Sequence, residues 1–333
     1  MDKKILCNLI KTPYKYNKLV VAASGLDGEF DSIYTDVPFL FRHNGKFCMT
    51  YVGFDGIGYQ TALSVSDDLI HWQRQGLLIG RGEHGSINEF NVAMTSILKD
   101  DELFGTGELK KVNGRYVGTY HAYPKPGYEA GPAIIGLCFS DDLKKWELSQ
   151  AILCAEDGAD WERGGLYKSY LVENNGTYYL FYNAKDKIQW PWTEQTGVAI
   201  SSDLINWRRY PGNPILHAGA KGAFDDVFAS DPCVHKYEKN WIMFYFGNSS
   251  DGHAREGAAF SSDLLQWDKS DEILIDTGIP GAVDSTHAHK PGIIGVNGVL
   301  YHFYCAVAPN PAIEGKVDRG ISLAVSNEKV FQN

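Results

Sequence analysis

The stretch Phe30-Asp31-Ser32-Ile33-Tyr34-Thr35-Asp36-Val37-Pro38 recurs in related form along this chain of 333 residues. It leads into an apolar run, the tight turn Asn44-Gly45 and a second apolar run, which is the pattern of a β-hairpin. Aligned without gaps, four copies of the stretch carry an acid at their second position: Asp31, Glu162, Asp225 and Asp284. Recurrence of one hairpin unit predicts a repeat protein built from similar sheets.

A second motif supports the same period. Ser-Asp-Asp-Leu or Ser-Ser-Asp-Leu is followed by two variable residues and then a tryptophan, which gives Trp72, Trp146, Trp207 and Trp267, spaced 60 to 74 residues apart. This spacing leaves room for four strands per unit. The Ser and Asp side chains favour a capped turn. Because the tryptophan recurs in every copy, we expect it to pack the turn onto its own sheet rather than to stack on a ligand.

These repeats predict an all-β fold, a five-bladed β-propeller with four antiparallel strands per blade and a single domain over residues 1–333. The aromatic content of 13% and the 35 glycines agree with it. In closed propellers an end strand often completes the last blade. We expect Leu19–Ala23 or Ile321–Val325 to do so. The predicted blades span residues 29–85, 86–155, 156–218, 219–277 and 278–333.

The amino-acid composition argues against several classes of binding partner and cofactor. The net charge of −10 argues against binding to a nucleic-acid backbone. No apolar run approaches membrane-spanning length, and the N-terminal run is too short for a signal-peptide core. The six cysteines lack the paired spacing of a zinc or redox site. We therefore expect a cytoplasmic protein that needs no cofactor, although its many oxygen ligands would allow a divalent ion such as Ca²⁺.

The blade openings hold the candidate functional residues. Three openings place an ionisable group beside a proline, a residue suited to strand starts. Residues that build the scaffold should be the same in every copy, whereas residues of a single functional site should differ between copies. The repeated second-position acids are therefore expected to be mainly structural, with Asp31 kept as a substrate-binding candidate. The residues that differ between copies are better candidates: Asp36, Lys168, Asp231, His287, His289 and Lys290. Trp190 and Trp192, in a Pro-containing loop, are further candidates for lining a binding site.

Blade openings of the Asp-Pro type together with Ser-Asp-Asp-Leu-x-x-Trp turns resemble the furanosidase superfamily. That group includes glycoside hydrolase families 43, 32, 62 and 117 and the mannoside phosphorylases of family 130. The resemblance covers nearly the whole chain from about residue 29. It implies hydrolysis of a glycosidic bond by carboxylates around a central pocket. In the inverting version, base and acid lie about 6.5 to 9.5 Å apart.

Carried over residue by residue, the resemblance matches Asp36 to the catalytic base and Asp231 to an acid that tunes the proton donor or orients the substrate. The Glu-Gly-Pro context of the family 43 general acid is missing here. The proton donor is therefore left between two kinds of residue. One is a histidine at the fifth opening, His289 or His287, as in family 117. The other is a glutamate: Glu162, Glu108 or Glu89.

The resulting expectation is an inverting, exo-acting glycosidase, resembling family 43, that acts on short oligosaccharides in the manner of arabinofuranosidases, xylosidases or galactosidases. A second candidate function is a phosphorylase, which needs a cationic pocket for phosphate. Its candidate ligands are Lys168, Lys290, Arg163 and His289. A third is a non-catalytic sugar-binding propeller, which would have equivalent sites in several blades. The sequence predicts no oligomeric state.

Overall fold

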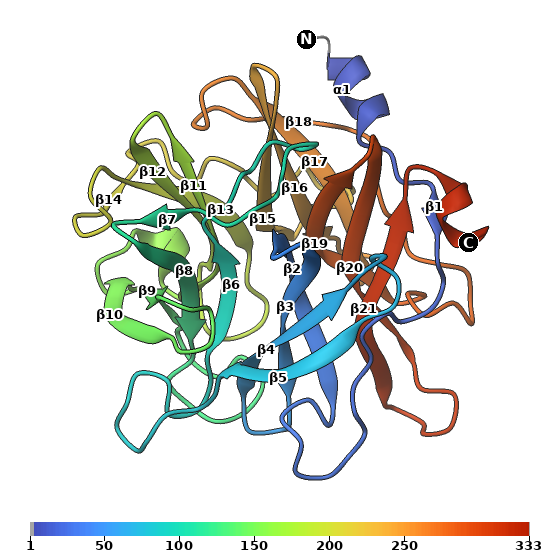
Figure 1. The fold of residues 1–333 in the computed structure, drawn as a ribbon, viewed down its shortest axis with the longest axis horizontal. Helices are drawn as coiled ribbons and strands as arrows, with labels where there is room; N and C mark the ends of the chain where they lie inside the picture. The colour runs from blue at the N-terminus through green and yellow to red at the C-terminus, as the bar shows by residue number, and fades with distance from the viewer. Residues whose placement is uncertain (1–2, 333) are drawn as a thin grey trace.

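The computed structural model describes residues 3–332 and is all-β, as predicted (Figure 1). One α-helix is found among these residues, α1 (Lys3–Leu9), with two short 3₁₀ segments, η1 (Asp160–Glu162) and η2 (Glu328–Gln332). No helix in this range is both long enough and apolar enough to cross a bilayer.

The strands fall into consecutive groups, in which each strand pairs antiparallel with a neighbour. The first group is β2 (Tyr34–His43), β3 (Lys46–Phe54), β4 (Tyr59–Ser66) and β5 (Gln73–Ile79). The second is β6 (Ala93–Ile97), β7 (Lys111–Val112), β8 (Arg115–Ala122), β9 (Ile134–Ser140) and β10 (Glu147–Leu153). The third is β11 (Gly165–Asn174), β12 (Thr177–Lys185), β13 (Glu194–Ser201) and β14 (Arg208–Arg209).

The fourth group is β15 (Phe228–Tyr237), β16 (Asn240–Asn248), β17 (Ala254–Ser261) and β18 (Asp268–Lys269). The last comprises β19 (His287–Val296), β20 (Val299–Pro309), β21 (Val317–Val325) and, from the other end of the chain, β1 (Tyr14–Lys15). Strand β2 packs against β19 and β21, so the first and last groups are neighbours in space. The groups follow the predicted units, while the closed five-bladed ring stays a prediction.

The N-terminal segment completes the last group, although one part of this expectation was wrong. β1 pairs with β21, and β21 is the predicted strand Ile321–Val325 extended toward its N-terminus. The predicted strand Leu19–Ala23 is reduced to a single bridge between Val21 and Ile321. Pairing of the two chain ends covers the edge of β21, which would otherwise expose unpaired backbone groups.

Each repeated second-position acid is buried and paired with a cation, and three of the four also accept a tyrosine hydroxyl. The Tyr245 hydroxyl donates to Asp225 at 2.9 Å, and Lys269 of β18 lies 2.5 Å from the same carboxylate. Asp284 is paired with the Tyr304 hydroxyl and Lys15. The remaining copies are Glu162 with Tyr182 and Arg209, and Asp31 with Arg74. These acids are therefore structural, as the repeat predicted.

The Ser-Asp-Asp-Leu turns are also structural. In the first, the Ser66 hydroxyl accepts the Leu69 amide, and the Asp68 carboxylate accepts the amides of Ile70 and His71. The indole nitrogen of Trp72 donates to the Leu69 carbonyl at 3.2 Å. Trp207 and Trp267 make the equivalent bond at 3.2 and 3.1 Å. These indoles fix the turn, which agrees with the packing role predicted from their recurrence.

Each first strand of a group carries a register irregularity near its start. In β2, β11, β15 and β19 the irregularity surrounds a non-glycine residue with positive φ: Val37 (54°), Lys168 (46°), Asp231 (57°) and Lys290 (64°). In β6 the shift lies between Met94 and Ser96, without such a residue. A bulge re-aims side chains locally while the ladder continues beyond it.

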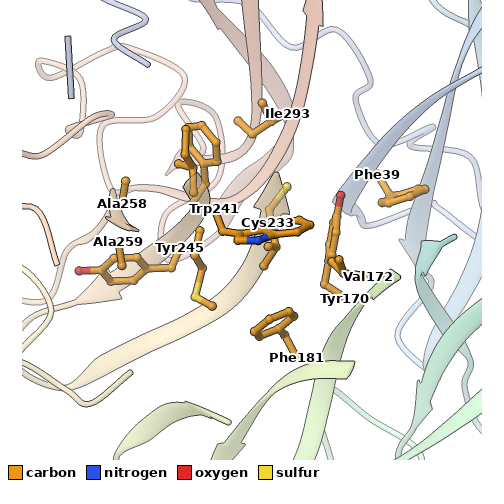
Figure 2. Close-up of a cluster of buried hydrophobic side chains, with 14 of the residues drawn as sticks. Phe39, Tyr170, Val172, Phe181, Cys233, Trp241, Tyr245, Ala258, Ala259 and Ile293 are labelled. Atoms are coloured by element: carbon orange, nitrogen blue, oxygen red, sulfur yellow. The ribbon is translucent and has the colours of Figure 1, made fainter. Parts of the chain in front are cut away.

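Beyond these bulges the interior is packed with apolar side chains. Figure 2 shows Phe39, Tyr170, Cys233 and Ile293, which come from β2, β11, β15 and β19, in one buried cluster. The rings of Phe39 and Tyr170 meet edge-on with centroids 5.9 Å apart. Apolar side chains thus pack the interior beyond the bulged ends.

Replacing Lys15 by methionine tests the closure by β1. The change leaves the buried Asp284 carboxylate without its cation, so we expect a loss of about 3 kcal/mol in the free energy of unfolding, measured by urea denaturation. The control Lys3→Met removes an exposed pair with Asp268 and should cost less than about 1 kcal/mol. Equal effects of the two variants would contradict the structural role of β1.

Candidate functional site

A cavity of about 210 Å³ opens at the bulged ends of the first strands. Its lining comes from all five strand groups, so no single repeat could form it. The charged and imidazole side chains that line it are His121, Glu129, Lys168, Glu194, Asp231, His287, His289, Lys290 and Arg319. Its aromatic walls are Tyr59, Tyr128, Tyr167, Trp192, Phe228 and Phe246.

The bulge decides which opening residue faces the cavity. The residue with positive φ lines it in four strands, as Val37, Lys168, Asp231 and Lys290. Asp36 stands one position earlier, at the place held by Ser230 in the fourth group. Asp36 and Asp231 are therefore not equivalent, although both precede a proline closely. The first strand presents Val37 where the fourth presents a carboxylate.

Asp36 is buried behind two cations and is not part of the cavity lining. Its Oδ2 atom accepts hydrogen bonds from Lys290, at 2.8 Å, and from Arg319, while Oδ1 accepts the Val37 amide. Burial alone would raise the pKa of Asp36, but Arg319 and Lys290 hold it well below the usual range. This carboxylate is permanently charged, and its place suits it to fixing the two cations rather than to activating water.

Asp231 and Glu194 are the two buried carboxyl groups that do line the cavity. Burial raises the pKa of Asp231 to about 7, and the neighbouring Glu194 and Asp36 add to the rise, while Lys168 and Lys290 oppose it. Burial likewise raises the pKa of Glu194. Such shifted carboxyl groups in a cleft are typical of acid–base catalysis.

The two carboxyl groups differ in their hydrogen bonds. Glu194 accepts from the Trp192 indole and from the Ser230 hydroxyl, both at 2.8 Å. These bonds stabilise its ionised form. The Oδ2 atom of Asp231 is buried without a hydrogen-bond partner. Glu194 should therefore ionise first, and Asp231 should retain its proton to higher pH.

The histidines of the fifth opening line the cavity but are poor proton donors. Burial, with Arg319 and Lys290 nearby, lowers the pKa of His289 well below 6.5, and its Nδ1 lies 3.1 Å from the Cys305 carbonyl. Burial lowers the pKa of His287 to about 4, and Arg319 contributes. Both rings are neutral near pH 7. Asp284 does not oppose these shifts, because its carboxylate is engaged with Tyr304 and Lys15.

Two further polar groups shape the cavity. Lys168 is buried at its bulge, and its backbone amide donates to the His121 imidazole at 3.2 Å. Glu129 stands nearer the opening, where its Oε1 accepts a hydrogen bond from the Tyr59 hydroxyl and lies 3.9 Å from Lys290. The cavity thus offers carboxylates and ammonium groups to the hydroxyls of a small polar ligand.

The structure separates several predicted residues from the cavity. Glu162 and Asp31 are buried in ion pairs with Arg209 and Arg74 and lie outside the lining, so the structure does not support their predicted roles as proton donor and substrate ligand. Arg163 contacts backbone carbonyls of residues 155 and 156 instead. Trp190 is 63% exposed and contacts Trp192, which alone of the two lines the cavity. Glu89 binds His84 and the Gly85 amide, and Glu108 is likewise absent from the lining.

Sequence reasoning missed Glu194, Glu129, His121 and Arg319. None of them lies in a repeated opening motif: Glu194 begins β13, Glu129 is in the β8–β9 connection, and Arg319 is in β21. One available signal was a departure from the repeat. Glu194 starts a third strand at the end where the first strands carry their bulges, and its equivalent in the next group, by pairing register, is Ala254.

A metal ion has no evident site. No cluster of three or more His, Cys, Asp and Glu side chains between residues 3 and 332 is arranged to hold one. The six cysteines are all free thiols. A bound divalent ion such as Ca²⁺ stays a prediction.

Comparison with known proteins gives consistent matches. The model of a family described as "Glycosyl hydrolases family 32 N-terminal domain" matches residues 107–279. A solved structure of a complex of BT0996 with RGII has a TM-score of 0.82 and 32% identity, and the match covers 97% of this protein and 94% of that one. The predicted likeness to family 43 in particular stays a prediction.

Two curated relatives match part of the chain. A 1,2-beta-oligomannan phosphorylase from Thermoanaerobacter sp. (strain X514) is 30% identical over 45% of this chain and 42% of the relative. A beta-xylosidase from Xylanibacter ruminicola is 26% identical over 49% of this chain and 48% of the relative. The chain therefore spans less than half the length of these two relatives.

The role of Asp36 can be tested by stability. Asp36→Asn removes the carboxylate shared by Lys290 and Arg319 and leaves only Glu129, 3.9 Å from Lys290, as a counter-charge, so we expect a loss of about 3–5 kcal/mol in the free energy of unfolding by urea denaturation. Asp67→Asn, which removes an exposed pair with Lys46, is the control and should cost less than about 1 kcal/mol. An Asp36→Asn protein as stable as the control variant would argue against the positioning role.

Proposed function

This chain belongs to the family of the glycosyl hydrolases family 32 N-terminal domain, and on that basis we propose that it is a glycoside hydrolase whose active site is the cavity described above. The observation that carries the proposal is the buried pair Asp231 and Glu194, with unequal hydrogen bonding, in a cavity lined by polar groups. We also propose that the five strand groups form a closed five-bladed propeller, which the contact of β2 with β19 and β21 supports.

Asp231 is the proposed general acid and Glu194 the proposed base or nucleophile. Asp231 keeps a proton to about pH 7, which it can give to the leaving oxygen. Glu194 is held ionised by the Trp192 and Ser230 donors and can act on the anomeric carbon or on a water molecule. A pair of carboxyl groups whose environments separate their pKa values divides the acid and base roles in this way.

The substrate is proposed to be the terminal sugar of a short oligosaccharide or glycoside. A cavity of about 210 Å³ is smaller than the range of about 300–1,000 Å³ typical of drug-sized ligands, which suits one sugar ring. Closure of the interior below the bulges supports exo action, because a chain could not pass through. The beta-xylosidase likeness makes xylosides, with arabinofuranosides and galactosides, the first substrates to try. Inversion at the anomeric carbon and a cytoplasmic location remain part of the proposal.

A phosphorylase is the second candidate. Lys168 lines the cavity without a carboxylate partner in the ion pairs described between residues 3 and 332, unlike Lys290 and Arg319, which Asp36 neutralises. An ammonium group free to bind phosphate is what this reaction needs, and the likeness to an oligomannan phosphorylase agrees with it. Turnover that requires inorganic phosphate and yields a sugar phosphate would favour a phosphorylase over a hydrolase.

A screen of aryl glycosides with the two carboxyl variants tests the assignment. We expect Asp231→Asn and Glu194→Gln each to lower kcat by about 10²–10⁴ on phenyl glycosides. On 2,4-dinitrophenyl glycosides, whose leaving group needs no proton, Asp231→Asn should lose far less, while Glu194→Gln should lose as much as before. Product stereochemistry by NMR then shows inversion or retention. Full activity of both variants would refute the assignment.

The pH profile gives an independent test. Because Asp231 must be protonated to act as the acid, kcat/KM should fall as the pH rises past about 7. Lys168 lowers the pKa of Asp231, so Lys168→Met should move this limb to higher pH, by up to about one unit. Lys46→Met, in an exposed ion pair, is the control and should leave the limb in place. A limb that stays fixed or moves to lower pH in Lys168→Met would contradict the assignment.

A further inference from the structure

A second, larger hollow lies beside the proposed active site. It measures about 690 Å³ and is formed by three segments: residues 19–33 ahead of β2, residues 280–286 ahead of β19, and the end of β20 with the start of β21. Both β2 and β19 begin at the end of the molecule where the active-site cavity opens. The hollow therefore lies on the face through which a substrate enters.

Arg319 connects the two spaces. It lines both the hollow and the active-site cavity. Its guanidinium is held in place by Asp36, by the Tyr128 hydroxyl at 2.8 Å and by the Cys305 sulfur at 3.3 Å. Arg319 is therefore a wall common to both spaces, and a group attached to a ligand in the cavity has the hollow as its neighbouring space.

The chemistry of the hollow differs from that of the cavity. Its lining is aliphatic and proline-rich, with no aromatic ring, and includes Leu19, Ile33, Pro280, Val283, Pro309 and Pro311. Its polar residues are few, and two of them are already engaged: Arg319 as described, and Asp318 by the Asn310 amide at 2.7 Å. Apart from the hydroxyls of Ser285 and Thr286, a sugar placed here would find few partners to replace the hydrogen bonds that it makes with water. An apolar group makes no hydrogen bonds with water and so would lose none on entering the hollow.

Exposed aliphatic side chains continue this apolar surface. Ile33 in the lining is 43% exposed, and Ile279, beside Pro280, is 81% exposed. An apolar surface of this kind next to a polar cavity is typical of a binding site. We propose that the hollow is the leaving-group subsite and that it accepts an apolar aglycone, alkyl or aryl, attached to the sugar held in the cavity; this proposal rests on the proposed function.

Binding of paired thioglycosides tests the subsite without depending on turnover. The probes are the methyl and n-hexyl thioglycosides of xylose, arabinofuranose, galactofuranose and fructofuranose, with sulfur on the anomeric carbon, and their binding is measured by calorimetric titration. Burying the alkyl chain should make the hexyl compound of the recognised sugar bind about 10- to 100-fold more tightly than the methyl compound. The ratio of kcat/KM for hexyl and methyl O-glycosides should rise to a similar extent.

Two variants introduce a charge at the surface of the hollow, Ile33→Glu and Pro311→Glu. Each should reduce the hexyl-to-methyl ratio to within about threefold of unity while leaving methyl thioglycoside affinity unchanged. Ile205→Glu is the matched control, because Ile205 is 77% exposed and lies outside the hollow, and it should keep the full preference.

The outcomes separate the two proposals. Equal affinities for methyl and hexyl compounds in the unaltered protein, or a preference that survives both variants, would overturn the apolar subsite. The apolar subsite would also be overturned if a disaccharide with the same terminal sugar bound more tightly than the hexyl compound. Hexyl-selective binding with no cleavage of any glycoside would instead uphold the subsite and refute hydrolysis.

Discussion

The site depends on one backbone constraint: in four of the five strand groups, a residue near the start of the first strand adopts the left-handed conformation. In a regular strand, successive side chains point to opposite faces. The bulges at Val37, Lys168, Asp231 and Lys290 interrupt this alternation and line the cavity with these residues. A non-glycine residue in this conformation costs about 1–2 kcal/mol. The strained conformation recurs where functional groups converge, a common place for backbone strain.

The charged side chains around the cavity form two layers, one behind the lining and one in it. Asp36 lies behind the lining and is kept ionised by Lys290 and Arg319, and its single negative charge offsets one of their two positive charges. Asp231 and Glu194 lie in the lining, where burial raises their pKa values although Lys168 and Lys290 partly oppose the rise at Asp231. The layer behind the lining, Asp36, holds the two cations in place. The layer in the lining contains Asp231, a carboxyl group that can change its protonation near neutral pH.

The scaffold and the site use acids differently. Asp225 and Asp284 each accept a tyrosine hydroxyl and a lysine ammonium in the same geometry, which ties the loop ahead of a first strand to the outer strand of its group. This repeated bonding engages Oδ2 of each carboxylate, and neither residue lines the cavity. The site carboxyl groups have different partners from one another, and Asp231 has a buried oxygen with none.

The repeats in the sequence were sufficient to predict an all-β chain of similar strand units, the packing role of the Ser-Asp-Asp-Leu turns and the structural role of the repeated acids. These features depend on short stretches of sequence, and the recurrence of a residue in every copy indicates that it has the same role in each. The opening motifs also drew attention to Asp231, Lys168, Lys290, His287 and His289, which the structure gathers in one cavity.

Tertiary structure alone decided the remainder of the site. Asp36 and Asp231 look alike beside their prolines, and only the bulge places one behind the lining and the other in it. Glu194, Glu129 and Arg319 come from other strands and loops, which the sequence could not place at the same end of the molecule. Whether a carboxyl group is ionised depends on burial and on neighbours distant in sequence, and these exist only once the sheets have packed around a common centre.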